Sequence, residues 1–221
     1  PEEIFFISNN VNSDELRFAI EAGVKISVDS VSQLELYGKL NEGGRIAFRI
    51  NPGVGAGHHE KVKTAGSKTK FGIDMRYIPQ VKEILKKYNL KLTGINQHIG
   101  SLFMDSEAYL ESTRNILSVA KEFPELEFID LGGGFGIPYR KQDNQSRLNL
   151  QELGNKLSDL ITGWVKEYGK QIEFKVEPGR YIVAESGVLL GTVNSVKTNY
   201  DIRYIGTDLG FNVLLRPAMY D

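Results

Sequence analysis

The sequence contains no cysteine. This absence excludes disulfide bonds, thiolate metal sites and cysteine nucleophiles, and we predict a cytoplasmic protein without a bound metal. The chain also lacks any apolar run near the roughly 18 residues that a membrane-spanning helix requires. Its first residues show no signal-peptide pattern. We therefore expect no association with a membrane.

No charge of one sign dominates the sequence. Lysine and arginine number 27 and aspartate and glutamate 28, which gives a formal net charge of −1. A near-neutral balance offers no electrostatic attraction for nucleic acid or an anionic membrane surface, so we expect neither as a partner. Hydrophobic residues make up 41% of the chain and charged residues 25%, and these ordinary values predict a folded globular protein.

Short apolar segments alternate with helical patterns through most of the chain, which is typical of βαβ units and a parallel sheet. We expect strands at residues 4–7, 24–28, 45–50, 92–97, 126–131 and 172–176, and helices at residues 13–22, 31–40, 78–88, 107–122 and 150–168. Ser13 is the expected cap of the first helix. Residues 53–70 form a long glycine-rich excursion, and loops of that length are usually functional or mobile.

About six βα units are too few to close a (β/α)8 barrel, which has eight strands. The sheet is therefore either open and doubly wound, or a barrel that lacks its first strands. Because the chain starts at Pro1 without a methionine, we favour the barrel and expect a piece of a longer polypeptide. After residue 186 two strand-like runs, 188–196 and 202–206, follow without a helix between them. We predict an α/β barrel domain over residues 1–186 and the beginning of a β-rich domain over residues 187–221.

Polar residues and glycines collect where the later strands end. They include His98 and Ser101, the run Gly132-Gly133-Gly134, and Glu177 with Arg180. Active sites of parallel α/β folds lie at this end of the sheet. A dinucleotide fingerprint would need a third glycine at position 137, which is isoleucine. Binding of NAD by the glycine run is therefore not expected.

Three of these groups are the parts that a pyridoxal phosphate site requires. An imidazole can stack on the pyridine ring, glycines can admit the phosphate, and a carboxylate can keep the ring nitrogen protonated. Each group also has an ordinary structural interpretation: a core histidine, turn glycines, or a surface ion pair at a tight turn.

Longer motifs carry a resemblance to one enzyme family. In chain order they are Arg49-Ile50-Asn51-Pro52, Lys70-Phe71-Gly72, Gln97-His98-Ile99-Gly100-Ser101, Asp130-Leu131-Gly132-Gly133-Gly134-Phe135-Gly136, Glu177-Pro178-Gly179-Arg180 and Leu215-Arg216-Pro217-Ala218-Met219-Tyr220-Asp221. Over essentially its whole length the chain resembles the pyridoxal-phosphate-dependent ornithine, diaminopimelate and arginine decarboxylases, and is most similar to those acting on diaminopimelate. The resemblance implies an incomplete TIM-type barrel of the alanine racemase kind, with pyridoxal 5'-phosphate as cofactor.

The resemblance also implies a role for each matching residue. His98 and Glu177 are the expected catalytic residues, His98 stacking on the pyridine ring and Glu177 facing its nitrogen. The other expected cofactor contacts are Ser101, Gly132, Gly133, Gly134, Pro178, Gly179 and Arg180. Arg180, Arg216 and Tyr220 are expected to hold the distal end of an amino-acid substrate, where arginine suits a carboxylate. The implied reaction is the decarboxylation of meso-diaminopimelate to lysine.

Two parts of the family's site are expected outside this chain. The Schiff-base lysine belongs to the first barrel strand, and a later segment supplies a cysteine across the dimer interface. We therefore expect a homodimer at full length and an inactive fragment here. Lys175 shares strand parity with Glu177, but no motif supports it as the missing lysine.

Three alternatives stay open from the sequence. The first is a non-catalytic relative that binds a ligand or partner. The second is a decarboxylase of ornithine, arginine or lysine. The third is a phosphate-binding barrel that acts on a sugar phosphate. The last of these needs no Schiff-base lysine.

Overall fold

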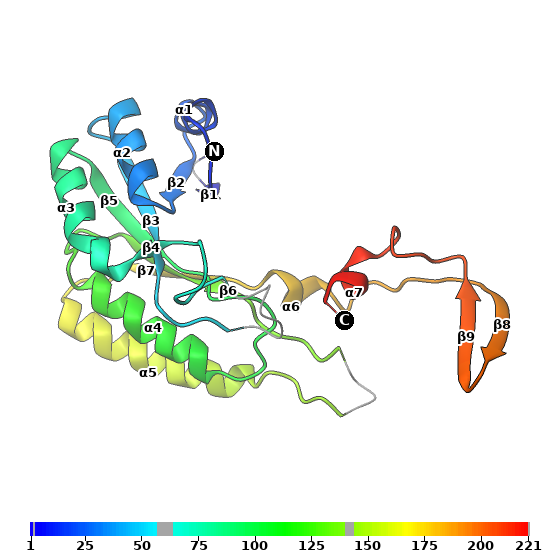
Figure 1. Ribbon diagram of the computed structural model, residues 1–221. Helices are drawn as coiled ribbons and strands as arrows, with labels where there is room; N and C mark the ends of the chain where they lie inside the picture. The colour runs from blue at the N-terminus through cyan, green and yellow to red at the C-terminus, as the bar shows by residue number, and fades with distance from the viewer. Residues whose placement is uncertain (2, 57–63, 140–143, 221) are drawn as a thin grey trace. The chain divides into compact units, whose positions relative to one another are not determined.

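The computed structural model describes residues 1, 3–56, 64–139 and 144–220 (Figure 1). The chain divides into two compact units, Pro1–Ile182 and Val183–Asp221. The first unit holds a parallel sheet with its helices, and the second holds a small antiparallel sheet. Within the described residues, no helix is long and apolar enough to cross a membrane.

The first unit is built on a parallel sheet whose strands follow chain order. The hydrogen-bonded order is β1 (Phe5–Ile7), β2 (Lys25–Val28), β3 (Arg45–Asn51), β5 (Lys91–Asn96), β6 (Phe128–Gly133) and β7 (Glu173–Glu177). A two-residue strand, β4 (Ile73–Asp74), pairs with the end of β3. An open doubly wound sheet changes its strand order at a switch point, whereas a barrel keeps chain order. The sheet is therefore the curled part of a TIM-type barrel, as the sequence predicted.

Helices connect successive strands and cover the outer face of the curled sheet (Figure 1). They are α1 (Ser13–Glu21), α2 (Val31–Leu40), α3 (Ile78–Lys87), α4 (Glu107–Ala120) and α5 (Leu150–Tyr168), with a 3-10 helix at Met75–Tyr77 before α3. The core lies between helices and sheet: Phe48 of β3 is fully buried, and its ring meets the Phe123 ring at a centroid distance of 5.8 Å. Because side chains alternate along a strand, Arg49 and Asn51 point to the opposite, inner face.

The start of α1 and the end of α5 follow from local chemistry. The Asn12 side chain accepts hydrogen bonds from the backbone N–H groups of Asp14 and Glu15, and Glu15 Oε2 accepts from Asn12 N at 2.9 Å. The N-cap of α1 is therefore Asn12 and not the predicted Ser13. This capping box satisfies the backbone N–H groups of the first helical turn and that of Asn12 itself. α5 ends at Gly169, whose φ of +75° is a left-handed conformation that favours glycine.

The second unit contains a β-hairpin and a short helix. β8 (Val193–Asn199) and β9 (Ile202–Thr207) pair antiparallel, and α7 (Leu215–Tyr220) follows. Helix α6 (Gly179–Val183) leads out of β7 into this unit. The antiparallel sheet fits the predicted change to β structure after the barrel, although β8 begins at Val193 and not at residue 188. The predicted domain boundary at residue 186 stays a prediction.

Candidate active site

Charged and polar side chains share the inner face of the sheet. Arg49 of β3 lies opposite Asn96 of β5 in the strand register. Asn96 is in turn paired with Asp130 of β6, and Asp130 with Lys175 of β7. Residues paired in register point to the same face, so these four side chains form one row across the sheet. Ser27 of β2 joins the row, because its Oγ donates to Asn96 Oδ1 at 2.5 Å across the intervening strand.

Two carboxyl groups meet at the end of this row. The Glu177 carboxyl, on the same face as Lys175, is hydrogen-bonded to the Asp130 carboxyl. Asp130 is 2% exposed, and its Oδ1 accepts from the backbone N–H of Gly132 at 2.8 Å. Burial, together with the Asp130 carboxyl, raises the pKa of Glu177 to about 7, and burial also raises the pKa of Asp130. The pair therefore retains a proton close to neutral pH, although much of the Glu177 residue is exposed.

His98, which follows β5, lies beside this pair. Its Nδ1 accepts a hydrogen bond from the backbone N–H of Gly133 at 3.3 Å, and Gly133 is paired in register with Glu177. The structure thus brings the two predicted catalytic residues to one strand end. Burial, and the nearby Arg49 charge, lower the pKa of His98 to about 4. The imidazole is therefore neutral at pH 7 and carries its proton on Nε2.

The glycine run is required by close backbone packing at this point. A Cβ atom would lie 2.2 Å from the Gln97 carbonyl oxygen at Gly132, 1.9 Å from that of Glu177 at Gly133, and 2.2 Å from that of Gly100 at Gly134. Two of the three amide groups already have acceptors in the protein, Asp130 for Gly132 and His98 for Gly133. The run therefore fixes the end of β6 against the segments that follow β5 and β7. Its predicted contact with a phosphate stays a prediction.

Arg49 is a further site residue, for which the motif Arg49-Ile50-Asn51-Pro52 alone predicts no role. It is 8% exposed, its Nη2 donates to His98 O at 3.1 Å, and its guanidinium lies 4.9 Å from the centre of the Phe71 ring. Burial lowers the pKa of Arg49, while the Asp29 and Glu177 charges act in the opposite direction. The sequence signal for it is an arginine between Phe48 and Ile50 at an inward position of a buried strand, where a buried charge needs a partner.

Arg180, at the start of α6, offers a buried donor. Its Nη1 has no hydrogen-bond partner in the described part of the chain, and its guanidinium lies 5.8 Å from the centre of the Tyr139 ring. A Cβ on the adjacent Gly179 would meet nothing within 4 Å, so this glycine leaves open space. Ser101 and Pro178 are both partly buried, in the segments after β5 and β7.

The other predicted substrate contacts belong to the second unit. Arg216 and Tyr220 lie in α7 of the second unit, and the side chain of Tyr220 is outside the described part of the chain. Their contact with substrate stays a prediction. Lys175 Nζ forms an ion pair with Glu173 Oε2 at 2.8 Å. Among the residues that the structure describes, no group of three or more histidine, aspartate or glutamate side chains could hold a metal ion.

A family model described as "Pyridoxal-dependent decarboxylase, pyridoxal binding domain" matches residues 1–184. The chain belongs to this family. The matched range contains His98, the glycine run, Glu177 and Arg180, and so includes every site residue of the first unit. The predicted resemblance is confirmed, and so is pyridoxal phosphate as the cofactor of the family.

Named relatives of this pyridoxal-binding domain agree with the family match. A diaminopimelate decarboxylase of Methanothermobacter thermautotrophicus is 42% identical over 100% of the chain and 52% of the relative. The enzyme of Escherichia coli K12 is 32% identical over the same shares. A crystal structure of the Helicobacter pylori enzyme complexed with L-lysine has a TM-score of 0.87 at 29% identity, covering 100% of the chain and 56% of that structure. The chain therefore spans about half the length of the relatives it matches.

The described residues fit a pyridoxal phosphate. The buried Nη1 of Arg180 has no acceptor among the described residues, and a phosphate or carboxylate oxygen would supply one. The neutral His98 imidazole suits the face of an aromatic ring, and a carboxyl that retains a proton near pH 7 suits a ring nitrogen.

Proposed function

We propose that this chain forms the greater part of the cofactor site of a decarboxylase that converts meso-diaminopimelate to lysine. The observation that carries the proposal is the position of Gly133, which bonds to the His98 imidazole and pairs with Glu177. One aromatic ring can meet an imidazole at its face and a carboxyl at its edge only where both lie together. Similarity to relatives named diaminopimelate decarboxylase, at up to 42% identity, supports the same reaction.

Glu177 is proposed to act at the ring nitrogen of the cofactor. When bound, pyridoxal phosphate supplies a protonated ring that accepts the electron pair left behind by departing carbon dioxide. Glu177 holds the proton at that nitrogen, because its raised pKa lets a proton be shared near neutral pH. Asp130 keeps the carboxyl in place through their hydrogen bond.

The other site residues hold and orient the cofactor. His98 presents a flat, uncharged imidazole, which avoids repulsion with a protonated pyridine ring. Arg180 Nη1 donates to the phosphate or to a substrate carboxylate. The phosphate contacts expected of Ser101, Pro178, Gly179 and the glycine run complete this part of the proposal.

The substrate and the assembly extend beyond the first unit. Arg216 and Tyr220 are proposed to join Arg180 at the distal carboxylate of diaminopimelate. Two solved relatives are titled as complexes with L-lysine, which is what diaminopimelate becomes when it loses one carboxylate. We also propose that the full-length protein is a cytoplasmic homodimer whose Schiff-base lysine and cross-subunit cysteine lie outside this chain.

Carbon dioxide release tests this function. The full-length protein, supplied with pyridoxal phosphate, is assayed with diaminopimelate, ornithine, arginine and lysine. We expect release from meso-diaminopimelate with a kcat/KM at least tenfold above that of the others, about 1.4 kcal/mol in transition-state stabilisation. Release from another diamino acid instead would reassign the substrate. Cofactor binding without any release would indicate the non-catalytic relative, and absence of cofactor binding would contradict the site itself.

A further inference from the structure

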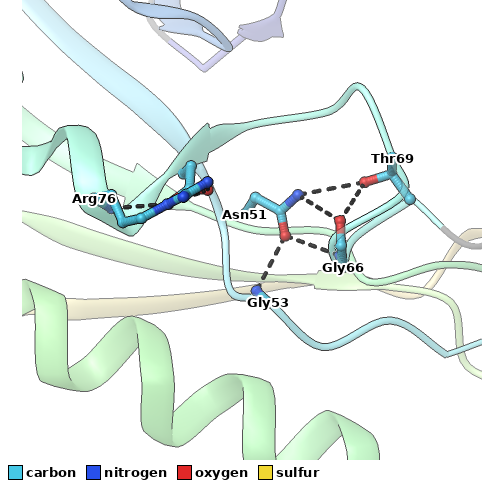
Figure 2. Close-up of polar contacts among 6 residues, drawn as sticks. Asn51, Gly53, Gly66, Thr69 and Arg76 are labelled. Carbon is cyan, nitrogen blue, oxygen red and sulfur yellow. Dashed lines mark hydrogen bonds and ion pairs between the residues drawn. The ribbon is translucent and has the colours of Figure 1, made fainter.

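The segment between β3 and β4 is closed at its base by one side chain, Asn51 (Figure 2). We call the described base, residues 53–56 and 64–69, the stem. Asn51 Oδ1 accepts from Gly53 N at 3.0 Å and from Gly66 N at 2.9 Å. Asn51 Nδ2 donates to Gly66 O at 3.0 Å and to Thr69 Oγ1 at 3.4 Å. One amide group therefore joins both arms of the stem to the end of β3.

The two arms of the stem lie in direct contact. A Cβ on Gly55, in the first arm, would lie 2.2 Å from the carbonyl oxygen of Ala65 in the second. Ala65 is 4% exposed and belongs to the main hydrophobic core. The stem is therefore a packed part of the first unit, and its position is fixed by β3 and the core.

The stem bonds directly to the backbone of His98 and Ile99. Thr64 Oγ1 donates to His98 O at 2.9 Å, next to the Arg49 donor at 3.1 Å. Ala56 N donates to Ile99 O at 3.0 Å, and Thr64 N donates to the same oxygen at 3.4 Å. Both carbonyl groups thus have two donors each, and three of these four donors belong to the stem.

These bonds matter for the imidazole because His98 lies beyond the end of β5, where strand pairing no longer fixes the backbone. On the ring side, the bond from Gly133 N to Nδ1 is 3.3 Å long. A rotation of the His98 peptide group would move the ring away from that amide. The stem holds the peptide plane, and the glycine run then holds the ring.

We propose that Asn51 and Thr64 are positioning residues for the His98 imidazole: through the stem they fix the His98 peptide group and so the ring orientation. The role of that ring against a cofactor rests on the proposed function, whereas the orientation itself does not. Asn51 acts through Gly66 and the stem, and Thr64 acts through its hydroxyl on the His98 carbonyl.

The test compares Thr64→Val, Thr64→Ser and a matched control, Thr93→Val, in the full-length protein. Valine removes the Thr64 hydroxyl at nearly constant volume, and serine keeps it. Thr93 Oγ1 donates to Ile46 O at 3.2 Å, so its replacement removes one buried bond of the same kind away from the stem. The first readout is the nitrogen NMR spectrum of the histidine side chains without cofactor, with His98 assigned by its loss in His98→Gln. The second is the Kd for pyridoxal phosphate.

We expect Thr64→Val to shift the His98 Nδ1 signal. We also expect it to weaken cofactor binding about five- to tenfold, which corresponds to the loss of one hydrogen bond. Thr64→Ser and Thr93→Val should leave the signal in place and the Kd within twofold. Asn51→Asp, which removes the Nδ2 donor, should act in the same direction as Thr64→Val. An unmoved His98 signal in folded Thr64→Val would overturn the proposal. If the parent protein bound no cofactor, the proposed function would fail while the NMR signals still tested the positioning.

Discussion

The Glu177 side chain is the clearest case in which one residue links stability to function. Folding raises its pKa from the ordinary 4.5 to about 7, through burial and the neighbouring Asp130 carboxyl. A carboxyl with a raised pKa adds stability that is present below its unfolded pKa and is lost as the pH rises through its folded pKa. This residue therefore lowers the free energy of unfolding between about pH 4.5 and pH 7.

Replacing Glu177 by glutamine should remove that pH dependence. Urea unfolding of the cofactor-free protein at pH 4.5 and pH 7.5 measures the effect, and we expect the parent to lose more stability across this range than Glu177→Gln. The reason is that glutamine keeps the shape of the protonated acid but cannot ionise. Equal losses in both proteins would contradict the raised pKa.

His98 should make the free energy of unfolding depend on pH with the opposite sign. Burial and the Arg49 charge lower its pKa from 6.5 to about 4, so its contribution is present above pH 6.5 and is lost as the pH falls through 4. The same unfolding experiment on His98→Gln should therefore show a smaller loss of stability on acidification than the parent shows. A variant that lost as much stability as the parent between pH 6.5 and pH 4.5 would argue against a buried neutral imidazole.

At the residue scale, the motifs identify which side chains belong together, but not their contacts. His98 and Glu177 are both predicted from the sequence, and the structure places them beside Gly133. The pairing of Asp130 with Glu177 is not predicted, because the β6–β7 register shifts between Asp130 and Gly133. The alternation of side chains predicts the face on which a residue lies only in a regular strand. A shift in register changes which residues of the two strands are paired.

At the scale of elements, the long helices are predictable and the short ones are not. α2 and α5 have the bounds expected from their periodicity. β4, with two residues, depends on pairing with β3, which no local pattern reveals. Glu177-Pro178-Gly179-Arg180 predicts a tight turn, whereas the short helix α6 begins at Gly179.

The end of β6 gives a sharp test of the packing between elements. Gly133→Ala adds a Cβ that would lie 1.9 Å from the Glu177 carbonyl oxygen, so we expect a loss of about 1–3 kcal/mol in the free energy of unfolding. The control is Gly163→Ala on α5, where a Cβ would meet nothing within 4 Å. Alanine should stabilise that helix by about 0.5–1 kcal/mol. Urea unfolding of both variants measures the difference, and a neutral Gly133→Ala would contradict the close approach of β6 and β7.

At the scale of the whole molecule, the alternation of strands and helices is sufficient to predict a parallel α/β fold, and strand order distinguishes the barrel from a doubly wound sheet. The sheet runs from β1 to β7. Next to β1, Phe18 of α1 is 73% exposed and Ile4 is 57% exposed. A closed barrel has eight strands, so we expect further barrel units of the full-length protein to cover these side chains. Arg216 and Tyr220, which the motifs assign to the substrate, lie in the second unit, so their role stays a prediction.

The central claim is that Glu177 holds a proton on the ring nitrogen of a pyridoxal cofactor stacked on His98. The most direct measurement is the 15N NMR shift of pyridoxal phosphate labelled at the ring nitrogen and bound to the full-length protein, for the parent and for Glu177→Gln. The account predicts a protonated nitrogen in the parent and an unprotonated nitrogen in the variant. An unprotonated nitrogen in the parent, or the same shift in both proteins, would contradict it.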